Sequence, residues 1–332
     1  MLVLGVETSC DETAAAVLES PRNLLSNVIH SQLVHEKWGG VVPELASREH
    51  IKRIIGIVEE ALSRAKCSLD NIDAFAVTYG PGLVGALLVG LTFVKSMAQA
   101  TGKPFIGINH LEGHIFSNIL SHERCKPPFI ALLVSGGHSN LVMVKDWGEY
   151  QVLGKTRDDA PGEAFDKVAK VLGLSYPGGP AIQKAATGGD RKFFKFPRAF
   201  MGKDSYEFSF SGLKTAVAVY LKDKDEAFIQ KHLADISASF QEAVCEVLAV
   251  KAITACRNHG IDKLSVGGGV AMNKRLREMT AEKAKRSGIE VFFPGPDLST
   301  DNAAMIAAAG AWYLERGIKS ELSLNAVPYL GI

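Results

Sequence analysis

The sequence predicts an α/β protein made of two duplicated lobes. Short apolar runs of strand length alternate with longer segments in which apolar residues recur at helical spacing. The order of three strands, a helix, a strand, a helix, a strand and a helix occurs twice along the 332 residues. A chain of this length can bury two cores of medium size. We therefore expect a first lobe at residues 1–125 and a second at 126–332.

The first lobe is expected to begin with three strands. The polar turn ETSCDET at residues 7–13 joins the first two, and such a turn can present amides and hydroxyls to a phosphate. The predicted strands are residues 2–6, 14–18, 24–30, 72–78 and 105–108, and the predicted helices are residues 44–66 and 85–100 and a helix from residue 109.

Residues 74–94 carry no charge and could suggest a membrane span. Gly80, Pro81 and Gly82 interrupt the stretch, so it is better explained as a strand followed by a helix. The chain starts directly with a strand pattern, and we expect neither a secretory signal nor a membrane segment. The five cysteines are scattered without a CxxC pair, which favours a reducing compartment such as the cytoplasm.

The second lobe repeats the order of the first. A turn SGGHS at residues 135–139 joins its first two strands, and a proline opens the first helix at its first turn. A largely helical insertion is expected at about residues 178–259. The final helix, from about residue 300, can pack back on the first lobe. The predicted strands are residues 129–134, 140–144, 150–155, 263–266 and 290–293, and the helices are residues 161–172, 273–287 and 300–316.

His110 and His114 lie four residues apart in the predicted helix, so their imidazoles share one face and can reach one metal ion. Glu112 lies about 200° around the helix from the pair, facing away. The order HxExH therefore differs from the zinc-protease signature HExxH, in which the glutamate acts as a base. An isolated HxxxH is also compatible with two histidines at the edge of a core.

Asp301 is the candidate third ligand. It lies at the start of the last helix of the second half, which is the counterpart of the histidine helix. A pseudo-twofold pairing of the lobes would bring the two helix starts to opposite walls of one cleft. The result would be a site of two histidines and one carboxylate with open positions for substrate. Asp301 alone is also explained as a first-turn carboxylate favoured by the helix dipole and by Ser/Thr capping, and the two interpretations are compatible.

Four glycine clusters can approach a ligand through the main chain: residues 79–82, 135–137, 177–180 and 266–273. The sequence contains neither a GxxxxGK[ST] motif nor a GxGxxG after the first strand, which excludes P-loop NTPases and disfavours a dinucleotide-binding domain. Asp166 is placed to bind ribose hydroxyls, or alternatively forms a helical ion pair with Lys170.

The formal net charge of +1 provides no global attraction for nucleic acid. Two local stretches are basic. Residues 191–203 interleave five basic residues, Lys203 included, with four phenylalanines, which suits an RNA backbone and unpaired bases. The alternative is a loop whose phenylalanines pack underneath. Residues 274–286 are better explained as a solvated helix face.

The motifs together resemble the TsaD family of tRNA threonylcarbamoyladenosine-forming transferases, formerly described as O-sialoglycoprotein endopeptidases. The resemblance covers nearly the whole chain and implies two duplicated lobes of the actin, Hsp70 and sugar-kinase (ASKHA) type around a central cleft. The motifs are ETSCDET (7–13), NHLEGH (109–114), LLVSGGHS (132–139), GEAFDKVAKVLGL (162–174), YPGGP (176–180), FSFSGLKTAV (208–217), VGGGVAMN (266–273) and STDNAAMIA (299–307).

The resemblance also implies site residues and partners. The metal, Fe²⁺ or Zn²⁺, is expected on His110, His114 and Asp301. The expected substrate-binding residues are Leu133, Val134, Ser135, Gly136, Gly137, Asp166, Gly179 and Asn273. Gln183 replaces an acidic residue typical of archaeal and eukaryotic relatives, which indicates a bacterial type. Its implied partners are a TsaB-like paralogue and a TsaE-like ATPase.

The implied reaction transfers threonylcarbamoyl from L-threonylcarbamoyladenylate to N6 of adenosine 37, in the anticodon loop of tRNAs that read ANN codons. His138 and Asp11 are the candidates for handling the proton, and the sequence does not choose between them. Two other classes remain open: a metalloprotease, which Glu112 disfavours, and a nucleotide-binding scaffold or small-molecule kinase that does not touch RNA.

Overall fold

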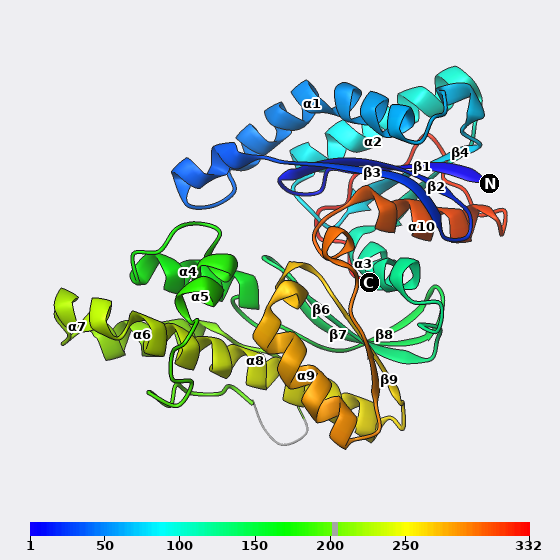
Figure 1. Cartoon of the computed structure of the whole chain (residues 1–332). Coiled ribbons are helices and arrows are strands. Elements are labelled where there is room, and N and C mark those ends of the chain that lie inside the picture. The colour runs from blue at the N-terminus through cyan, green and yellow to red at the C-terminus, as the bar shows by residue number, and fades with distance from the viewer. Residues whose placement is uncertain (201–204) are drawn as a thin grey trace. The chain divides into compact units, whose positions relative to one another are not determined.

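The computed structural model describes residues 1–200 and 205–332, and these fold into two compact units (Figure 1). Unit 1 consists of Met1–Arg124 and Pro294–Ile332, and unit 2 is Cys125–Phe293. Each unit contains one five-stranded sheet. Unit 1 is therefore discontinuous in sequence, because the chain leaves it after Arg124 and returns at Pro294.

The sheet of unit 1 has the strand order β3-β2-β1-β4-β5. The first three strands pair antiparallel, and β4 and β5 continue the sheet in parallel beside β1. The strands are β1 (Leu2–Glu7), β2 (Glu12–Glu19), β3 (Asn23–Ser31), β4 (Ala74–Gly80) and β5 (Phe105–Asn109).

Helices cover both faces of this sheet, α1 and α2 on one and α10 on the other (Figure 1). Leu4 and Val6 of β1 pack in the cluster that contains Ile54 of α1 and Leu91 of α2. Gly5 faces the side of the sheet opposite to Leu4 and Val6, and a Cβ atom added there would lie 2.5 Å from the carbonyl oxygen of Ala303. The helices are α1 (Pro43–Arg64), α2 (Val84–Thr101), α3 (His110–Ser121) and α10 (Ala303–Leu314), with the 3₁₀ turns η1 (Leu33–Trp38), η2 (Leu69–Asn71) and η4 (Pro296–Leu298).

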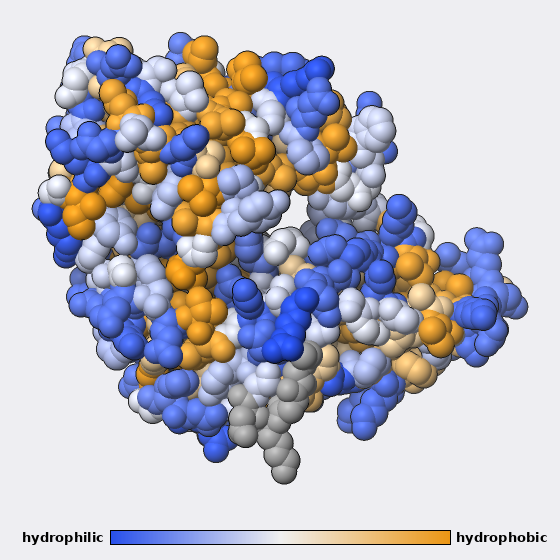
Figure 2. Space-filling view, turned by 180° about the vertical axis from the view of Figure 1, so that it is seen from behind, coloured by the Kyte–Doolittle hydropathy of each residue, from blue (hydrophilic) through white to orange (hydrophobic). Residues whose placement is uncertain are grey.

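Helix α2 is long and apolar enough to cross a membrane by length and composition alone. It nevertheless packs against β4 and buries Leu87, Leu91 and Val94, which is the behaviour of a core helix. The strand-then-helix division of residues 74–94 is confirmed. The molecular surface shows apolar side chains among hydrophilic ones (Figure 2). In unit 1, the exposed apolar side chains include Ile51 of α1 and Val84 of α2.

The sheet of unit 2 has the order β10-β9-β6-β7-β8. Its first three strands pair antiparallel and its last two continue in parallel, so each strand has a counterpart in unit 1. The predicted duplication of the strand order is confirmed. The strands are β6 (Phe129–Val134), β7 (Ser139–Asp146), β8 (Glu149–Lys155), β9 (Lys263–Gly267) and β10 (Glu290–Phe292).

The core of unit 2 lies between its sheet and helices that include α4 and α8. Phe165 of α4 and Phe240 of α8 meet edge to face at 5.3 Å, beside Leu132 of β6. The helices are α4 (Pro161–Val171), α5 (Gly178–Ala185), α6 (Ser211–Leu221), α7 (Glu226–Lys231), α8 (Leu233–Asn258) and α9 (Lys274–Arg286), with the 3₁₀ turn η3 (Gly269–Met272).

The last helix differs from its prediction at the start. It begins at Ala303, because Asn302 is the N-cap and its Oδ1 accepts a hydrogen bond from the Met305 amide at 3.0 Å. Asp301 therefore lies just outside the helix. The interpretation of Asp301 as a first-turn carboxylate is wrong, and its side chain is available for another role.

Candidate metal centre and substrate-binding loops

The histidine helix α3 starts directly after β5, as predicted. Asn109 is its N-cap, and the side-chain oxygen accepts hydrogen bonds from the amides of Leu111 and Glu112 at 2.9 and 3.4 Å. His110 and His114 follow one turn apart with 4% and 1% of their surface exposed. Their ring centroids lie 4.8 Å apart and the rings are nearly perpendicular. The two imidazoles thus share a buried face of the helix.

Asp301 joins the two histidines within unit 1. Its Oδ1 lies 3.1 Å from His114 Nε2 and 3.5 Å from His110 Nε2. One donor atom from each of the three residues lies within 4.8 Å of the others. Two imidazole nitrogens and one carboxylate oxygen are a donor set that suits Fe²⁺ or Zn²⁺. The residues present fit a divalent metal.

Glu7 also belongs to this cluster, although no motif in the sequence singles it out. It is the last residue of β1, it is fully buried, and its Oε2 lies 3.1 Å from His110 Nδ1. The sequence signal was an acid immediately after an apolar strand. That signal is weak, because it does not say which side chain the carboxylate meets.

The charges in the cluster support one another. Burial would lower the pKa of His110, but the carboxylates of Asp301 and Glu7 raise it well above its ordinary value. Burial would raise the pKa of both carboxyl groups, but His110 lowers the pKa of Glu7 and, together with His114, lowers that of Asp301. Without a metal ion, His110 and the two carboxylates therefore favour one another's charged forms.

Glu112 faces away from His110 and His114, as predicted. Its Oε1 accepts a hydrogen bond from the Tyr313 hydroxyl at 2.6 Å. A protease base needs to lie beside the metal. This arrangement therefore does not favour the metalloprotease alternative.

Asp11 lies in the turn between β1 and β2, in unit 1. Its carbonyl oxygen accepts a hydrogen bond from Gln32 N at 3.0 Å. His50 of α1 fixes the same turn, with ring nitrogens 2.9 Å from the Cys10 carbonyl oxygen and 2.8 Å from the Thr13 hydroxyl. Asp11 is thus held on a braced turn that begins at Glu7.

In unit 2, the turn after β6 presents open glycines. Ser135 N donates to the His138 carbonyl at 2.9 Å, and the Ser135 hydroxyl accepts from His138 N at 3.1 Å. A Cβ atom at Gly136 or Gly137 would meet nothing within 4 Å. The side chains of Leu133 and Val134 are buried in the sheet, so these two residues can contact a ligand only through their main chain.

Asp166 of α4 holds the start of α5. Its Oδ1 accepts a hydrogen bond from Gly178 N at 2.7 Å. A Cβ atom at Gly178 would lie 2.5 Å from the Asp166 Cα, whereas one at Gly179 would meet nothing within 4 Å. Gly179 is therefore the open residue of this loop, beside the Asp166 carboxylate.

Asn273 is the N-cap of α9, with Oδ1 accepting from Leu276 N at 3.1 Å. Its Nδ2 donates to Gln241 Oε1 at 2.8 Å. Gln183 of α5 reaches the same helix start, where its Oε1 accepts from Lys274 N at 2.7 Å. The helix start at Asn273 is therefore tied to α5.

The predicted substrate-binding residues of unit 2 thus lie on neighbouring segments. The amides of Gly162 and Glu163 donate to the carbonyls of Ser135 and Gly136, both at 3.2 Å. Asp166 of the same helix contacts α5, and α5 contacts α9. The fold brings together the loops that the sequence analysis treated separately.

The basic aromatic stretch is mostly a packing segment. Phe196 is fully buried, and Phe193 and Phe194 pack against the core of unit 2. This favours the alternative of phenylalanines that pack underneath the loop. Lys203, the last basic residue of the stretch, lies outside the described residues.

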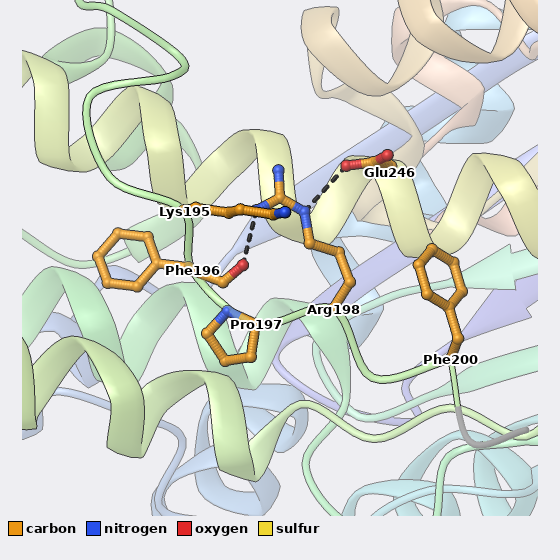
Figure 3. Close-up of a pocket in the computed structure, with 6 residues that line it drawn as sticks. All are labelled: Lys195, Phe196, Pro197, Arg198, Phe200 and Glu246. Carbon is orange, nitrogen blue, oxygen red and sulfur yellow. Dashed lines mark hydrogen bonds and ion pairs between the residues drawn. The ribbon is translucent and has the colours of Figure 1, made fainter.

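A pocket of about 350 Å³ adjoins this stretch (Figure 3). Arg198 crosses it to bind Glu246 Oε2 at 2.9 Å and the Phe196 carbonyl oxygen at 2.6 Å. The pocket is lined by Lys195, Phe196, Pro197, Arg198, Phe200 and Glu246. The arginine is thus committed to a structural ion pair.

Structural comparison shows the fold type. HypF in a phosphate- and nucleotide-bound form aligns with 93% of this chain and 54% of its own length, at a TM-score of 0.61 and 14% identity. Component A of the (R)-2-hydroxyglutaryl-CoA dehydratase of Acidaminococcus fermentans aligns over 94% and 98%, at a TM-score of 0.54 and 13% identity. Both are ASKHA-type proteins, and the predicted fold class is confirmed.

Sequence comparison shows the family. A protein of Clostridium botulinum strain Hall is 54% identical over 99% of this chain and 97% of its own length, and one of Clostridioides difficile strain 630 is 51% identical over 100% and 98%. Both are named tRNA N6-adenosine threonylcarbamoyltransferase. The family model with that description matches residues 23–308. The chain belongs to the TsaD family of tRNA N6-adenosine threonylcarbamoyltransferases.

Proposed function

We propose that this enzyme transfers the threonylcarbamoyl group of L-threonylcarbamoyladenylate to N6 of adenosine 37 in tRNAs that read ANN codons. The products are threonylcarbamoyladenosine in the tRNA and AMP. The observation that carries the proposal is the convergence of His110, His114 and Asp301 in a chain of this family. A convergent donor set of this kind suits a catalytic metal with open positions.

The metal is one divalent ion, Fe²⁺ or Zn²⁺, held by His110, His114 and Asp301. When bound, it supplies a Lewis acid for an oxygen of the threonylcarbamoyl group. The burial of both histidines supports this role, because a dry site strengthens electrostatic interactions.

The adenylate is held by the loops of unit 2. The amides of the exposed residues Gly136 and Gly137 suit the phosphate, and they can stabilise charge that develops in the transition state, as an oxyanion hole does. Asp166 binds the ribose hydroxyls beside the open Gly179, and Asn273 lies at the start of a helix whose N-terminus favours an anion.

In the chemical step, N6 of the adenosine attacks the carbamoyl carbon. A C–N bond forms, the bond from that carbon to the phosphate oxygen breaks, and AMP leaves with the electron pair. A base removes one proton from N6. We propose His138 or Asp11 for this task, since each lies on an anchored turn.

The enzyme works in the cytoplasm, with the tRNA anticodon loop as acceptor. We propose a TsaB-like paralogue and a TsaE-like ATPase as its protein partners. The relatives that match nearly the whole chain are bacterial, which agrees with the bacterial type from which these partners are inferred.

The test incubates the purified protein with threonylcarbamoyladenylate and unmodified ANN-decoding tRNA, with and without the two partners. Mass spectrometry of the nucleosides should show threonylcarbamoyladenosine only when this chain is present. The His110→Ala and His114→Ala variants should lose metal and product together. Transfer that persists in a metal-free variant would refute the metal's role.

A negative result also discriminates between classes. If AMP-type ligands bind but no combination gives product, the nucleotide-binding scaffold becomes the better explanation. Phosphorylation of a small molecule without tRNA would support a kinase. The partners and the adenylate are varied separately, so a missing partner is distinguished from a wrong substrate.

A further inference from the structure

We propose that Glu7 is a positioning residue for the metal site: its carboxylate accepts the Nδ1 proton of His110 and so presents Nε2 of that imidazole to the ion. The inference rests on the proposed metal role of His110. It adds a residue on a different element, at the end of β1, that does not itself touch the metal.

The Glu7 carboxylate is fixed by its neighbours. Its Oε1 accepts a hydrogen bond from Ser9 N at 2.5 Å, and its Oε2 accepts one from the Thr78 hydroxyl at 2.5 Å. The side chain is fully buried. With donors on two sides, the carboxylate has a defined orientation, and Oε2 lies 3.1 Å from His110 Nδ1.

This contact determines the tautomer of His110. A neutral imidazole carries one N–H, and an ionised carboxylate can only accept a hydrogen bond. In the neutral form that binds a metal, the proton therefore resides on Nδ1 and the lone pair on Nε2, the ring nitrogen that lies 3.5 Å from Asp301 Oδ1. The Ser9 hydroxyl, 3.1 Å from the same Nδ1, can donate or accept and does not decide the tautomer.

The Glu7 carboxylate also balances charge. A divalent ion bound by two neutral imidazoles and Asp301 leaves one net positive charge in a buried site. A buried charge without a partner is costly. The negative charge of Glu7 brings the sum to zero, so it should strengthen metal binding as well as orient the ring.

His114 provides an internal contrast. Its Nδ1 is buried and has no hydrogen-bond partner within residues 1–200 and 205–332. The two histidine ligands are thus supported differently, and the carboxylate serves His110 alone. Loss of Glu7 should therefore act on the geometry of one ligand.

The first test measures metal affinity by competition with a chelator, using Co²⁺, Zn²⁺ and anaerobic Fe²⁺ in turn. Glu7→Gln keeps the side-chain shape but removes the charge and one acceptor oxygen. We expect binding weaker by about 10–100-fold than in the wild type. Circular dichroism of the metal-free proteins checks that the variant is folded.

The matched control is Glu112→Gln. Glu112 is also a buried carboxylate that accepts from a hydroxyl, and it lies on the same helix as the ligands, facing away from them. Its variant should bind metal like the wild type. An affinity of Glu7→Gln equal to that of Glu112→Gln would overturn the proposal, and so would a wild-type protein that binds none of the three metals.

A second measurement needs no variant. In the Zn²⁺-loaded wild type, ¹⁵N spectra of labelled histidines should show His110 protonated at Nδ1 and metal-bound at Nε2. Coordination through Nδ1 would overturn the proposal even if Glu7→Gln failed to fold. Both readouts are independent of product formation, so an enzyme that binds metal through this arrangement but makes no threonylcarbamoyladenosine would refute only the proposed function.

Discussion

His114 Nε2 lies 3.1 Å from Asp301 Oδ1, although 187 residues separate the two in sequence. The contact holds α3 and the start of α10 together in unit 1. It also brings an imidazole nitrogen and a carboxylate oxygen close enough to share one ligand.

Replacing Asp301 by asparagine should therefore remove metal without unfolding the unit. The carboxamide keeps the size of the side chain but loses its charge, and we expect metal affinity to fall at least ~10–100-fold. Metal analysis after dialysis measures the loss. Asp297→Asn, an exposed change in the turn before Asp301, is the control, and equal metal content in the two variants would contradict the prediction.

Asp158 should stabilise the start of α6. Its carboxylate accepts hydrogen bonds from Phe210 N at 2.8 Å and Ser211 N at 3.2 Å, as a capping side chain does. Asp158→Ala should destabilise this helix start by about 1 kcal/mol. Hydrogen exchange of the amides at residues 210–216 should then be about fivefold faster. Asp223→Ala, an exposed change after α6, should leave the exchange unaltered.

The Asp158 contribution should depend on pH. Burial raises the pKa of this carboxyl, but hydrogen bonds from Ser209, Phe210 and Ser211 lower it below the ordinary value. A folded-state pKa below the unfolded value of about 3.9 means that the stabilisation is complete above that pH and is lost as the pH falls through the folded pKa. The exchange difference between wild type and Asp158→Ala should be constant from about pH 7 to 5 and shrink below about pH 4. A difference that grew on acidification would contradict this sign.

Gly5→Ala should destabilise unit 1 by about 1–3 kcal/mol, because the new methyl group would overlap the main chain of α10. The displaced helix start includes Ala303, two residues after Asp301, so metal affinity should fall as well.

Gly56→Ala is the opposite case. A Cβ atom there meets nothing within 4 Å in the middle of α1, and we expect a gain of about 0.5–1 kcal/mol. Thermal unfolding measures the stability of both variants. A Gly5→Ala variant as stable as the wild type would contradict the prediction, because it would show that β1 and α10 can move apart.

Gln183→Glu should strengthen the link between α5 and α9. The carboxylate would accept from Lys274 N in place of the carboxamide oxygen, and an anion at a helix N-terminus is favourable by about 0.3–1 kcal/mol. Gln183→Leu, which has no acceptor, should be less stable than the wild type. Chemical unfolding monitored in unit 2 ranks the three proteins. The reverse order of stability would mean that the contact between residue 183 and Lys274 N does not hold the start of α9.

Much of the fold follows from local patterns. Outside the insertion at about residues 178–259, which was predicted only as largely helical, the strands and helices were predicted within a few residues because their apolar periodicity is regular. The repeated order then predicted the counterpart relation of the two sheets. The start of α10 was predicted at residue 300, which is too early, since Asn302 is the cap and the helix begins at Ala303.

The site residues could be predicted only where helical spacing or the duplicated order of elements indicates them. His110 and His114 follow from helical spacing, and Asp301 from the equivalence of two helices. Glu7 could not be found, because its role depends on β1, β4 and α3 meeting in space. The basic aromatic stretch has no regular period, so its sequence could not show that Phe196 points into the core.

The discontinuity of unit 1 has a consequence for biosynthesis. The ribosome completes Met1–Arg124 and then all of unit 2 before it makes Pro294–Ile332. Until then, the nascent chain lacks both α10, which covers one face of the first sheet, and Asp301, the third member of the histidine cluster. The cluster can therefore form only after Asp301 has been translated, so a metal ion bound by all three residues would report that the chain has left unit 2 and returned to unit 1.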